Sequence, residues 1–202
     1  DYQAGGLVAG YDFRFGYRGQ GDAQRLREKC AELGVQCRIA EKVTLDGVTV
    51  SSTCIRGMLA RGDLAGANRF LGHPYSLTDT VRSGYHVGTA IGRPTVNMAY
   101  ATQVLVPRHG VYATVAHTDA GVYPAVTNIG VRPTFHGDGH VTVESNLLGF
   151  SGDLYGKRIR LDFYAFLRPE KTFADAQMLT RQIGADADAA LNILKESGAL
   201  PK

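Results

Sequence analysis

The sequence lacks most of the features that mark the easily recognised protein classes. Its 202 residues include no tryptophan, and the sequence has no run of roughly 18 apolar residues, which a membrane-spanning helix needs. The charge is nearly balanced, with 22 Lys and Arg against 19 Asp and Glu and a net charge of +3. No basic block with interleaved aromatic residues occurs. We therefore expect a protein that neither crosses a membrane nor binds nucleic acid.

Cysteine is also scarce, and its spacing excludes two further classes. Cys30, Cys37 and Cys54 form no CxxC pair, and no histidine lies at zinc-finger spacing from them. A disulfide framework and a structural zinc site are thus not expected, and we predict a reduced, cytoplasmic protein. The sequence has no charged-then-apolar leader, so a signal peptide is not expected. It starts at Asp1 without an initiator Met, which predicts that it comes from a longer parent protein with an upstream segment.

What the sequence does contain is ordinary globular composition with an excess of glycine. Hydrophobic residues make up 44% and charged residues 20%, and the 25 glycines are close to twice the average share of about 7%. The glycines predict many tight turns.

The hydrophobic period changes once along the chain. An apolar run at residues 7–9 precedes a glycine-rich loop, a helix that Asp22 caps and Gly34 ends, and strands at residues 35–40 and 43–50. Residues 51–71 have helical spacing. This order predicts part of a parallel α/β sheet. So few strands would leave the faces and edges of the sheet uncovered.

From Tyr75 the period becomes two, with short alternating runs at residues 111–115, 141–144 and 158–163. Glycine-rich turns between them predict a small closed β-barrel. After Arg168 and Pro169 a single apolar stripe predicts one last helix. We predict two domains, residues 1–72 and 73–202.

Two constellations of the first domain have the residue types that bind phosphate. In the glycine-rich loop, backbone N–H groups at a helix start could contact phosphate oxygens, although an ordinary strand-to-helix turn explains it as well. The second combines helix-start hydroxyls with an arginine one turn later, and an ordinary N-cap is the simpler alternative. The residues are Gly10, Asp12, Arg14 and Gly16 in the loop, and Ser51, Ser52, Thr53 and Arg56 at the helix start.

The third constellation lies in the second domain. Gly84, Gly88 and Gly92 precede Thr95 and Asn97, and this combination suits phosphates and Mg²⁺, a cation that prefers oxygen ligands. Glycine bends at a barrel rim are the alternative.

Glu144 shares a strand face with Thr142 and Asn146, away from the face of Val141 and Val143. A lone carboxylate among uncharged neighbours could act as a general base, and a solvent-facing glutamate is the plainer explanation.

These motifs together resemble the prokaryotic bifunctional FAD synthetase family, in which a riboflavin kinase is joined to an FMN adenylyltransferase. The matching stretches follow the family order over nearly the whole sequence. They are residues 10–16 (GYDFRFG), 51–56 (SSTCIR), 71–77 (LGHPYSL), 92–97 (GRPTVN), 110–113 (GVYA), 128–135 (NIGVRPTF), 152–156 (GDLYG) and 166–170 (FLRPE).

The resemblance implies that residues from about 75 onward form a six-stranded riboflavin kinase barrel with a C-terminal helix. It implies that Thr95 and Asn97 bind Mg-ATP, with Thr95 contacting the Mg²⁺, and that Glu144 is the base that accepts the proton of the riboflavin hydroxyl. Arg132 and Phe135 would lie on the flavin side, although a proline-containing turn explains that loop equally well. The expected ligands are ATP, ADP, riboflavin and FMN, and the expected assembly is a monomer.

Residues 1–72 resemble the later part of the adenylyltransferase module, which implies part of a Rossmann-like α/β nucleotidyltransferase domain. The sequence contains no His-x-Gly-His motif, which binds the triphosphate in that family. We therefore predict that the parent protein adenylylates FMN and that this chain alone does not. Two alternatives remain. One is a non-catalytic flavin- or nucleotide-binding module, and the other is a metal-binding protein that uses His136 and His140.

Overall fold

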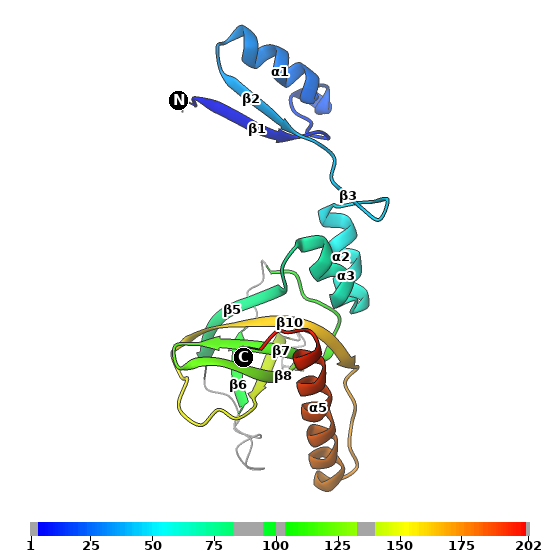
Figure 1. Cartoon of the computed structure of the whole chain (residues 1–202), viewed down its shortest axis with the longest axis vertical. Helices are drawn as coiled ribbons and strands as arrows, with labels where there is room; N and C mark the ends of the chain where they lie inside the picture. The colour runs from blue at the N-terminus through cyan, green and yellow to red at the C-terminus, as the bar shows by residue number, and fades with distance from the viewer. Residues whose placement is uncertain (1–3, 83–94, 100–103, 133–139, 201–202) are drawn as a thin grey trace. The chain divides into compact units, whose positions relative to one another are not determined.

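The computed structural model describes residues 4–82, 95–99, 104–132 and 140–200. Internal contacts divide the chain into two units, residues 1–51 and residues 52–202. Each unit is described by itself below, and Figure 1 shows the elements of both.

The first unit contains a parallel strand–helix–strand arrangement. Strands β1 (Gly6–Gly10) and β2 (Gln36–Ala40) pair in parallel, and helix α1 (Ala23–Glu32) connects them after a short 3-10 turn, η1 (Tyr17–Gly19). The Asp22 carboxylate caps α1 by accepting a 2.9 Å hydrogen bond from the backbone N–H of Arg25. The predicted parallel α/β segment is therefore confirmed.

The predicted strand at residues 43–50 is wrong, because the structure has a tight hairpin there. Strands β3 (Thr44–Leu45) and β4 (Val48–Thr49) are joined by Asp46 and Gly47, whose φ angles are 50° and 77°. Two central residues with positive φ match the right-handed twist of a hairpin, and Asp-Gly is a preferred pair for that turn.

The second unit opens with two helices, whereas the sequence predicted one helical stretch over residues 51–71. Helix α2 (Ser52–Arg61) ends at Gly62, where φ is 81°, and the Asp63 side chain caps α3 (Leu64–Leu71) by accepting from the Gly66 N–H at 2.9 Å. Gly62, with its left-handed backbone, ends α2, and the Asp63 cap begins α3.

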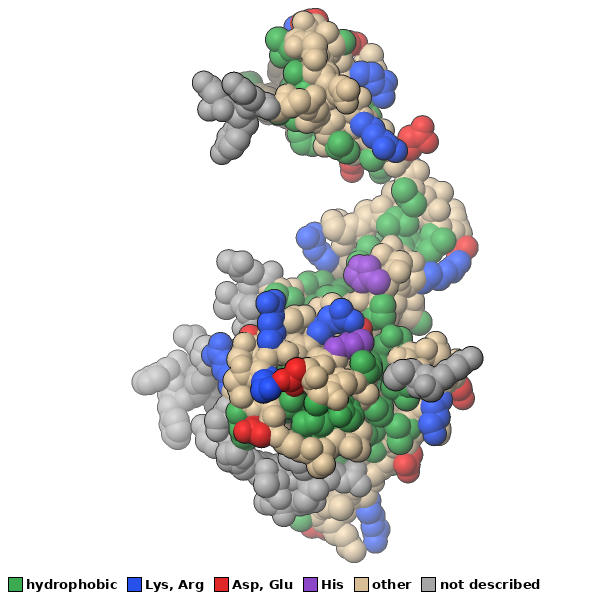
Figure 2. Space-filling model, turned by 60° about the vertical axis from the view of Figure 1, so that its left-hand side comes forward, with side chains coloured by type: hydrophobic (Ala, Val, Ile, Leu, Met, Phe, Trp, Pro, Cys, Tyr) green, Lys and Arg blue, Asp and Glu red, His purple; other side chains and the backbone are tan. Residues whose placement is uncertain are grey.

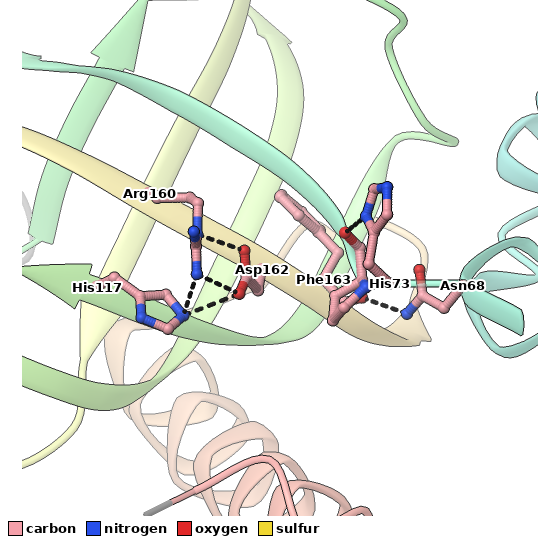
Figure 3. A network of polar contacts seen from close by, with 7 residues as sticks. Asn68, His73, His117, Arg160, Asp162 and Phe163 are labelled. Atoms are coloured by element: carbon pink, nitrogen blue, oxygen red, sulfur yellow. Dashed lines mark hydrogen bonds and ion pairs between the residues drawn. The ribbon is translucent and has the colours of Figure 1, made fainter. Parts of the chain in front are cut away.

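The α2–α3 pair packs on the barrel of the same unit. Leu59, Leu64 and Ala67 are at most 2% exposed and belong to the barrel core. Asn68 adds polar contacts, because its Nδ2 donates to the carbonyl of Phe163 at 2.7 Å and its Oδ1 accepts from the N–H of Tyr75 at 2.8 Å (Figure 3 shows the first of these). The start of the barrel is thus fixed to α3.

Six of the described strands close into a barrel in the order β10-β5-β6-β9-β8-β7, which confirms the predicted fold. Neighbouring strands are antiparallel throughout. The strands are β5 (Tyr75–Arg82), β6 (Thr95–Ala99), β7 (Gly110–Thr118), β8 (Gly121–Arg132), β9 (His140–Leu147) and β10 (Arg158–Arg168).

The inside of the barrel is filled mainly by apolar side chains, among them Tyr112, Ile129, Val143 and Phe163, each at most 2% exposed. Three buried hydroxyl groups also lie there, in a row across β7, β8 and β9. Thr127 Oγ1 is 2.7 Å from Thr114 Oγ1 and 2.8 Å from Ser145 Oγ, so each hydroxyl has a partner. Buried polar groups are tolerated when they are satisfied in this way.

Helix α5 (Ala176–Glu196) lies against the outside of the barrel, beside β7 and β8 (Figure 1). Its C-terminal half packs through Ala190 and Leu194 on Ala113 and Val115 of β7. Within the part of the chain that the structure describes, no helix combines the length and the apolar character needed to cross a membrane.

Candidate active site

The strand register gathers the predicted kinase residues on the outer face of the sheet. Asn97 of β6 lies opposite Glu144 of β9, and Glu144 lies opposite Asn128 of β8. Directly opposed residues in antiparallel strands have side chains on the same face. Thr95, one step along β6 on that face, lies opposite Asn146. The sequence-predicted residues Thr95, Asn97 and Glu144 are therefore neighbours, each half-buried.

A cavity of about 310 Å³ lies between this outer face and helix α5. Thr95 and Glu144 line its sheet side, and Leu179 and Ile183 of α5 line its helix side. The other lining residues are Val111, Val126, Asn128, Asn146, Arg168, Glu170, Lys171, Phe173, Asp186 and Ala187. A mostly apolar cavity with a few converging polar groups has the usual features of a small-molecule site.

A second carboxylate, that of Glu170, lies in the same cavity. Asn128 Nδ2 donates to Glu170 Oε1 at 3.0 Å, which joins the segment after β10 to the row that contains Glu144. Gly130 makes room for this carboxylate, because a Cβ at that position would be 2.3 Å from Glu170 Oε1. A side chain at this position would therefore displace the Glu170 carboxylate from its present place.

The cavity also contains a buried ion pair between the last residue of β10 and helix α5. Arg168 Nη2 is 2.7 Å from Asp186 Oδ2, and the two side chains are 15% and 7% exposed. The arginine charge in the cavity is therefore already matched by a carboxylate.

Several predicted residues lie outside the described residues, namely Gly84, Gly88, Gly92, Phe135 and His136. Arg132 ends β8 opposite His140, and the structure describes neither side chain. The flavin-side assignment of Arg132 and Phe135 and the histidine metal-site alternative stay predictions.

In the first unit, the predicted phosphate loop starts at Gly10, the last residue of β1. The carbonyl of Gly10 accepts from the N–H of Phe13 at 3.1 Å, and Gly16 has a φ of 75°. Asp12 and Arg14 belong to the same turn, which is followed by η1 and α1.

The second predicted phosphate motif starts α2. Ser51 precedes the helix, Ser52 and Thr53 are its first residues, and Arg56 Nη1 donates to Ser52 Oγ at 3.5 Å. This motif lies almost wholly in the second unit and the glycine-rich loop lies in the first, so the structure does not bring the two motifs together in one unit.

The described residues include no group of three or more His, Cys, Asp or Glu side chains that could hold a metal ion. The site instead offers scattered oxygen donors, from the Thr95 hydroxyl, the Asn97 amide and the carboxylates of Glu144 and Glu170. This donor set fits Mg²⁺, which is usually held by one or two carboxylates together with substrate phosphates.

Among the site residues that the sequence prediction did not select are Asn128, Arg168, Glu170 and Asp186. Three of them lie within the stretches 128–135 and 166–170. These stretches carry the family resemblance, but the resemblance did not assign a role to these three residues. Asp186 had a different signal, because it interrupts the apolar stripe of the last helix three residues after Ile183 and four before Ala190.

A closed antiparallel barrel with a C-terminal helix, and a cavity between the two that has carboxylate, hydroxyl and amide groups on its sheet side, define a small-molecule-binding barrel. Comparison with known proteins identifies the family. The riboflavin kinase family model matches residues 71–194, and the FAD synthetase model matches residues 1–54. The chain belongs to the riboflavin kinase family.

The chain is also similar to curated proteins. It is 40% identical to a bifunctional riboflavin kinase/FMN adenylyltransferase of Pseudomonas fluorescens, over 91% of this chain and 59% of the relative. It is 36% identical to the protein of that name from Bacillus subtilis, over 91% of this chain and 58% of the relative. The chain thus spans less than two thirds of the length of these relatives.

A solved structure, described as a macrolide-efflux protein from Streptococcus pneumoniae, is also similar. It has a TM-score of 0.80 and 27% sequence identity, and the match covers 92% of this chain and 60% of that chain.

Proposed function

We propose that the chain is an ATP-dependent riboflavin kinase, and that residues 73–202 contain its active site. The observation that carries the proposal is the row of Asn97, Glu144 and Asn128 on the outer face, beside Thr95 and above a cavity of about 310 Å³. The family match supports the same activity. These grounds favour phosphoryl transfer over the transport that the description of the Streptococcus pneumoniae neighbour suggests.

In the proposed reaction, the γ-phosphoryl group of ATP passes to the ribityl 5′-hydroxyl of riboflavin, which yields FMN and ADP. Glu144 accepts the proton of that hydroxyl as the new O–P bond forms and the bond to ADP breaks. Asn97, opposite Glu144 in the register, and Thr95, opposite Asn146, orient the phosphate groups through their amide and hydroxyl groups. Such catalysis consists mainly of positioning and charge stabilisation.

Mg²⁺, when bound with ATP, would neutralise the charge that develops on the phosphate oxygens. Thr95 and Asn97 would hold it, with the phosphates of ATP as the remaining ligands. The apolar side of the cavity, formed by Val111, Val126 and Leu179, suits the flat flavin ring.

We assign FMN adenylylation only to the longer relatives, whose names contain that activity. For this chain we propose small-molecule partners and a cytoplasmic location, since its three cysteines are not joined in disulfide bonds. Basic and acidic side chains are interspersed on the face of the barrel unit that Figure 2 shows, which supports a small ligand rather than nucleic acid.

The test is to incubate the protein with riboflavin, ATP and Mg²⁺ and to separate FMN by chromatography. FMN formation that requires all three is the expected result. Riboflavin binding without FMN formation would favour the alternative of a non-catalytic flavin-binding module. Binding is measured in parallel by the change in riboflavin fluorescence, so that the two outcomes are separated.

A further inference from the structure

The buried ion pair of Arg168 and Asp186 is more completely satisfied than a surface pair. Arg168 Nε donates to Asp186 Oδ1 at 3.0 Å, and Arg168 Nη2 donates to Oδ2 at 2.7 Å. Arg168 Nη1 donates to the carbonyl of Pro169 at 3.0 Å, and Gln182 Nε2 donates to Asp186 Oδ1 at 2.8 Å. This bidentate geometry holds the two groups in one orientation.

The pair joins the two sides of the cavity. Arg168 is opposite Val111, Val111 is opposite Asn128, and Asn128 is opposite Glu144, so Arg168 lies in the same row as the proposed base. Asp186 lies on α5, three residues after Ile183, and both ion-pair residues line the cavity. The pair is therefore a direct connection between the sheet that carries Glu144 and the helix that faces it.

The two halves of α5 are held differently. Its C-terminal half is fixed by apolar contacts of Ala190, Ile193 and Leu194 with the barrel. In its N-terminal half, Leu179 and Ile183 face the cavity. The ion pair joins the midpoint of α5, where that half ends, to the sheet.

Energetics supports a positioning role over a purely stabilising one. Taking two charges out of water costs about as much as their attraction returns, and an apolar pair of similar volume is often as stable. A buried ion pair at the edge of a ligand cavity therefore fixes the relative position of the two elements that it joins, which an apolar pair would not do.

We propose that Arg168 and Asp186 are positioning residues, which hold the N-terminal half of α5 at a fixed distance from Glu144 so that riboflavin fits between helix and sheet. The inference rests on the proposed kinase function. Neither residue takes part in the chemical step, so losing the pair should weaken flavin binding far more than it slows turnover.

The test uses Asp186→Asn, Arg168→Lys, and the double variant Arg168→Met with Asp186→Leu. We expect each single variant to raise KM and Kd for riboflavin by about tenfold or more, which corresponds to roughly 1.4 kcal/mol, with little change in kcat. The double variant should recover the melting temperature of the wild type and keep the raised Kd. Recovery of both quantities, or unfolding of the double variant, would overturn the positioning role and leave a stability role.

The matched control is Asp162→Asn on the same strand. Asp162 accepts from Arg160 Nε at 2.9 Å and lies 2.8 Å from His117 Nε2, in a network that is not part of the cavity lining (Figure 3). This variant should lose stability and keep the riboflavin Kd. An equal rise of Kd in the control would show that any loosening of β10 weakens binding, against the proposal.

The proposed function and the positioning role fail in different ways. Wild-type protein that neither binds riboflavin nor forms FMN would reject both. Wild-type protein that does both, with Kd unchanged in the single variants, would reject the positioning role alone.

Discussion

The inner and outer faces of strands β8 and β9 have different surroundings. On β9, Val143 and Ser145 point into the core and are at most 2% exposed, whereas Glu144 and Asn146 point out into the cavity. On β8, Ile129 points inward and Asn128 outward. Because adjacent residues face opposite sides of a strand, one segment builds the core and the site together. The two faces should respond differently to mutation, with stability affected on one and activity on the other.

The largest expected effect is that of Glu144→Gln on the outer face. The amide keeps the size of the side chain and cannot accept the hydroxyl proton, so turnover should fall by roughly 10²–10⁴. The measurement is kcat for FMN formation, with riboflavin binding followed by fluorescence. Ser145→Ala, its neighbour on the inner face, is the matched control and should retain kcat. Normal turnover in the Glu144 variant would remove this residue from the role of base.

The next effect concerns the inner face. Ile129 is 0% exposed, and Ile129→Ala should lower the free energy of unfolding by about 2–5 kcal/mol because it leaves a cavity in the core. Denaturant unfolding measures the loss. The folded fraction should keep the wild-type riboflavin KM, and a large change in KM without loss of stability would contradict the separation of the two faces.

A smaller loss is expected from the row of buried hydroxyls. Thr127→Val keeps the shape of the side chain but removes the 2.8 Å partner of Ser145. It also removes the 2.7 Å partner of Thr114, which keeps a 3.2 Å hydrogen bond to the carbonyl of Ala125. An unsatisfied buried hydroxyl costs about 1–3 kcal/mol, so the midpoint of denaturant unfolding should fall by less than in Ile129→Ala. An unchanged midpoint would mean that the hydroxyl row contributes nothing to the core.

The smallest effect is expected from an exposed pair outside both faces. The hydrogen bond from Lys157 lowers the pKa of Asp119, and the same bond raises the pKa of Lys157. A carboxyl group with a lowered folded-state pKa adds stability above its unfolded value, about 4, which is lost as the pH falls through the folded value. Asp119→Asn should therefore slightly flatten the acid limb of stability against pH, because exposed pairs contribute little. A steeper acid limb in the variant would contradict the sign of this shift.

The alternation on β9 could be predicted from the sequence, because period two is a local property. Spacing alone predicts that Glu144 and Val143 lie on opposite faces of the strand, and the structure has this arrangement. The barrel strands and the last helix were predictable because their apolar periods, of two and of about 3.6 residues, are also local.

Other features could not be predicted because they depend on contacts between distant residues. Arg168 contacts Asp186 only because the segment between them folds α5 back over the sheet. No local sequence pattern predicts how this segment folds. The break between α2 and α3 and the Asp46–Gly47 hairpin had local signals in their glycines, but helical and strand spacing outweighed them in the prediction.

Strand β10 closes the barrel, since it pairs with both β5 and β7. Arg158 lies opposite Thr80, so two segments far apart in the sequence must meet before β5 and β7 each have two neighbouring strands. Such distant pairing slows folding, because the chain loses loop entropy before the contacts form. On a ribosome, β5 to β9 would emerge with two open edges, and only the arrival of β10 would remove them. The vulnerable period of this protein is therefore the interval between the synthesis of β5 and that of β10, when exposed strand edges can pair with other chains.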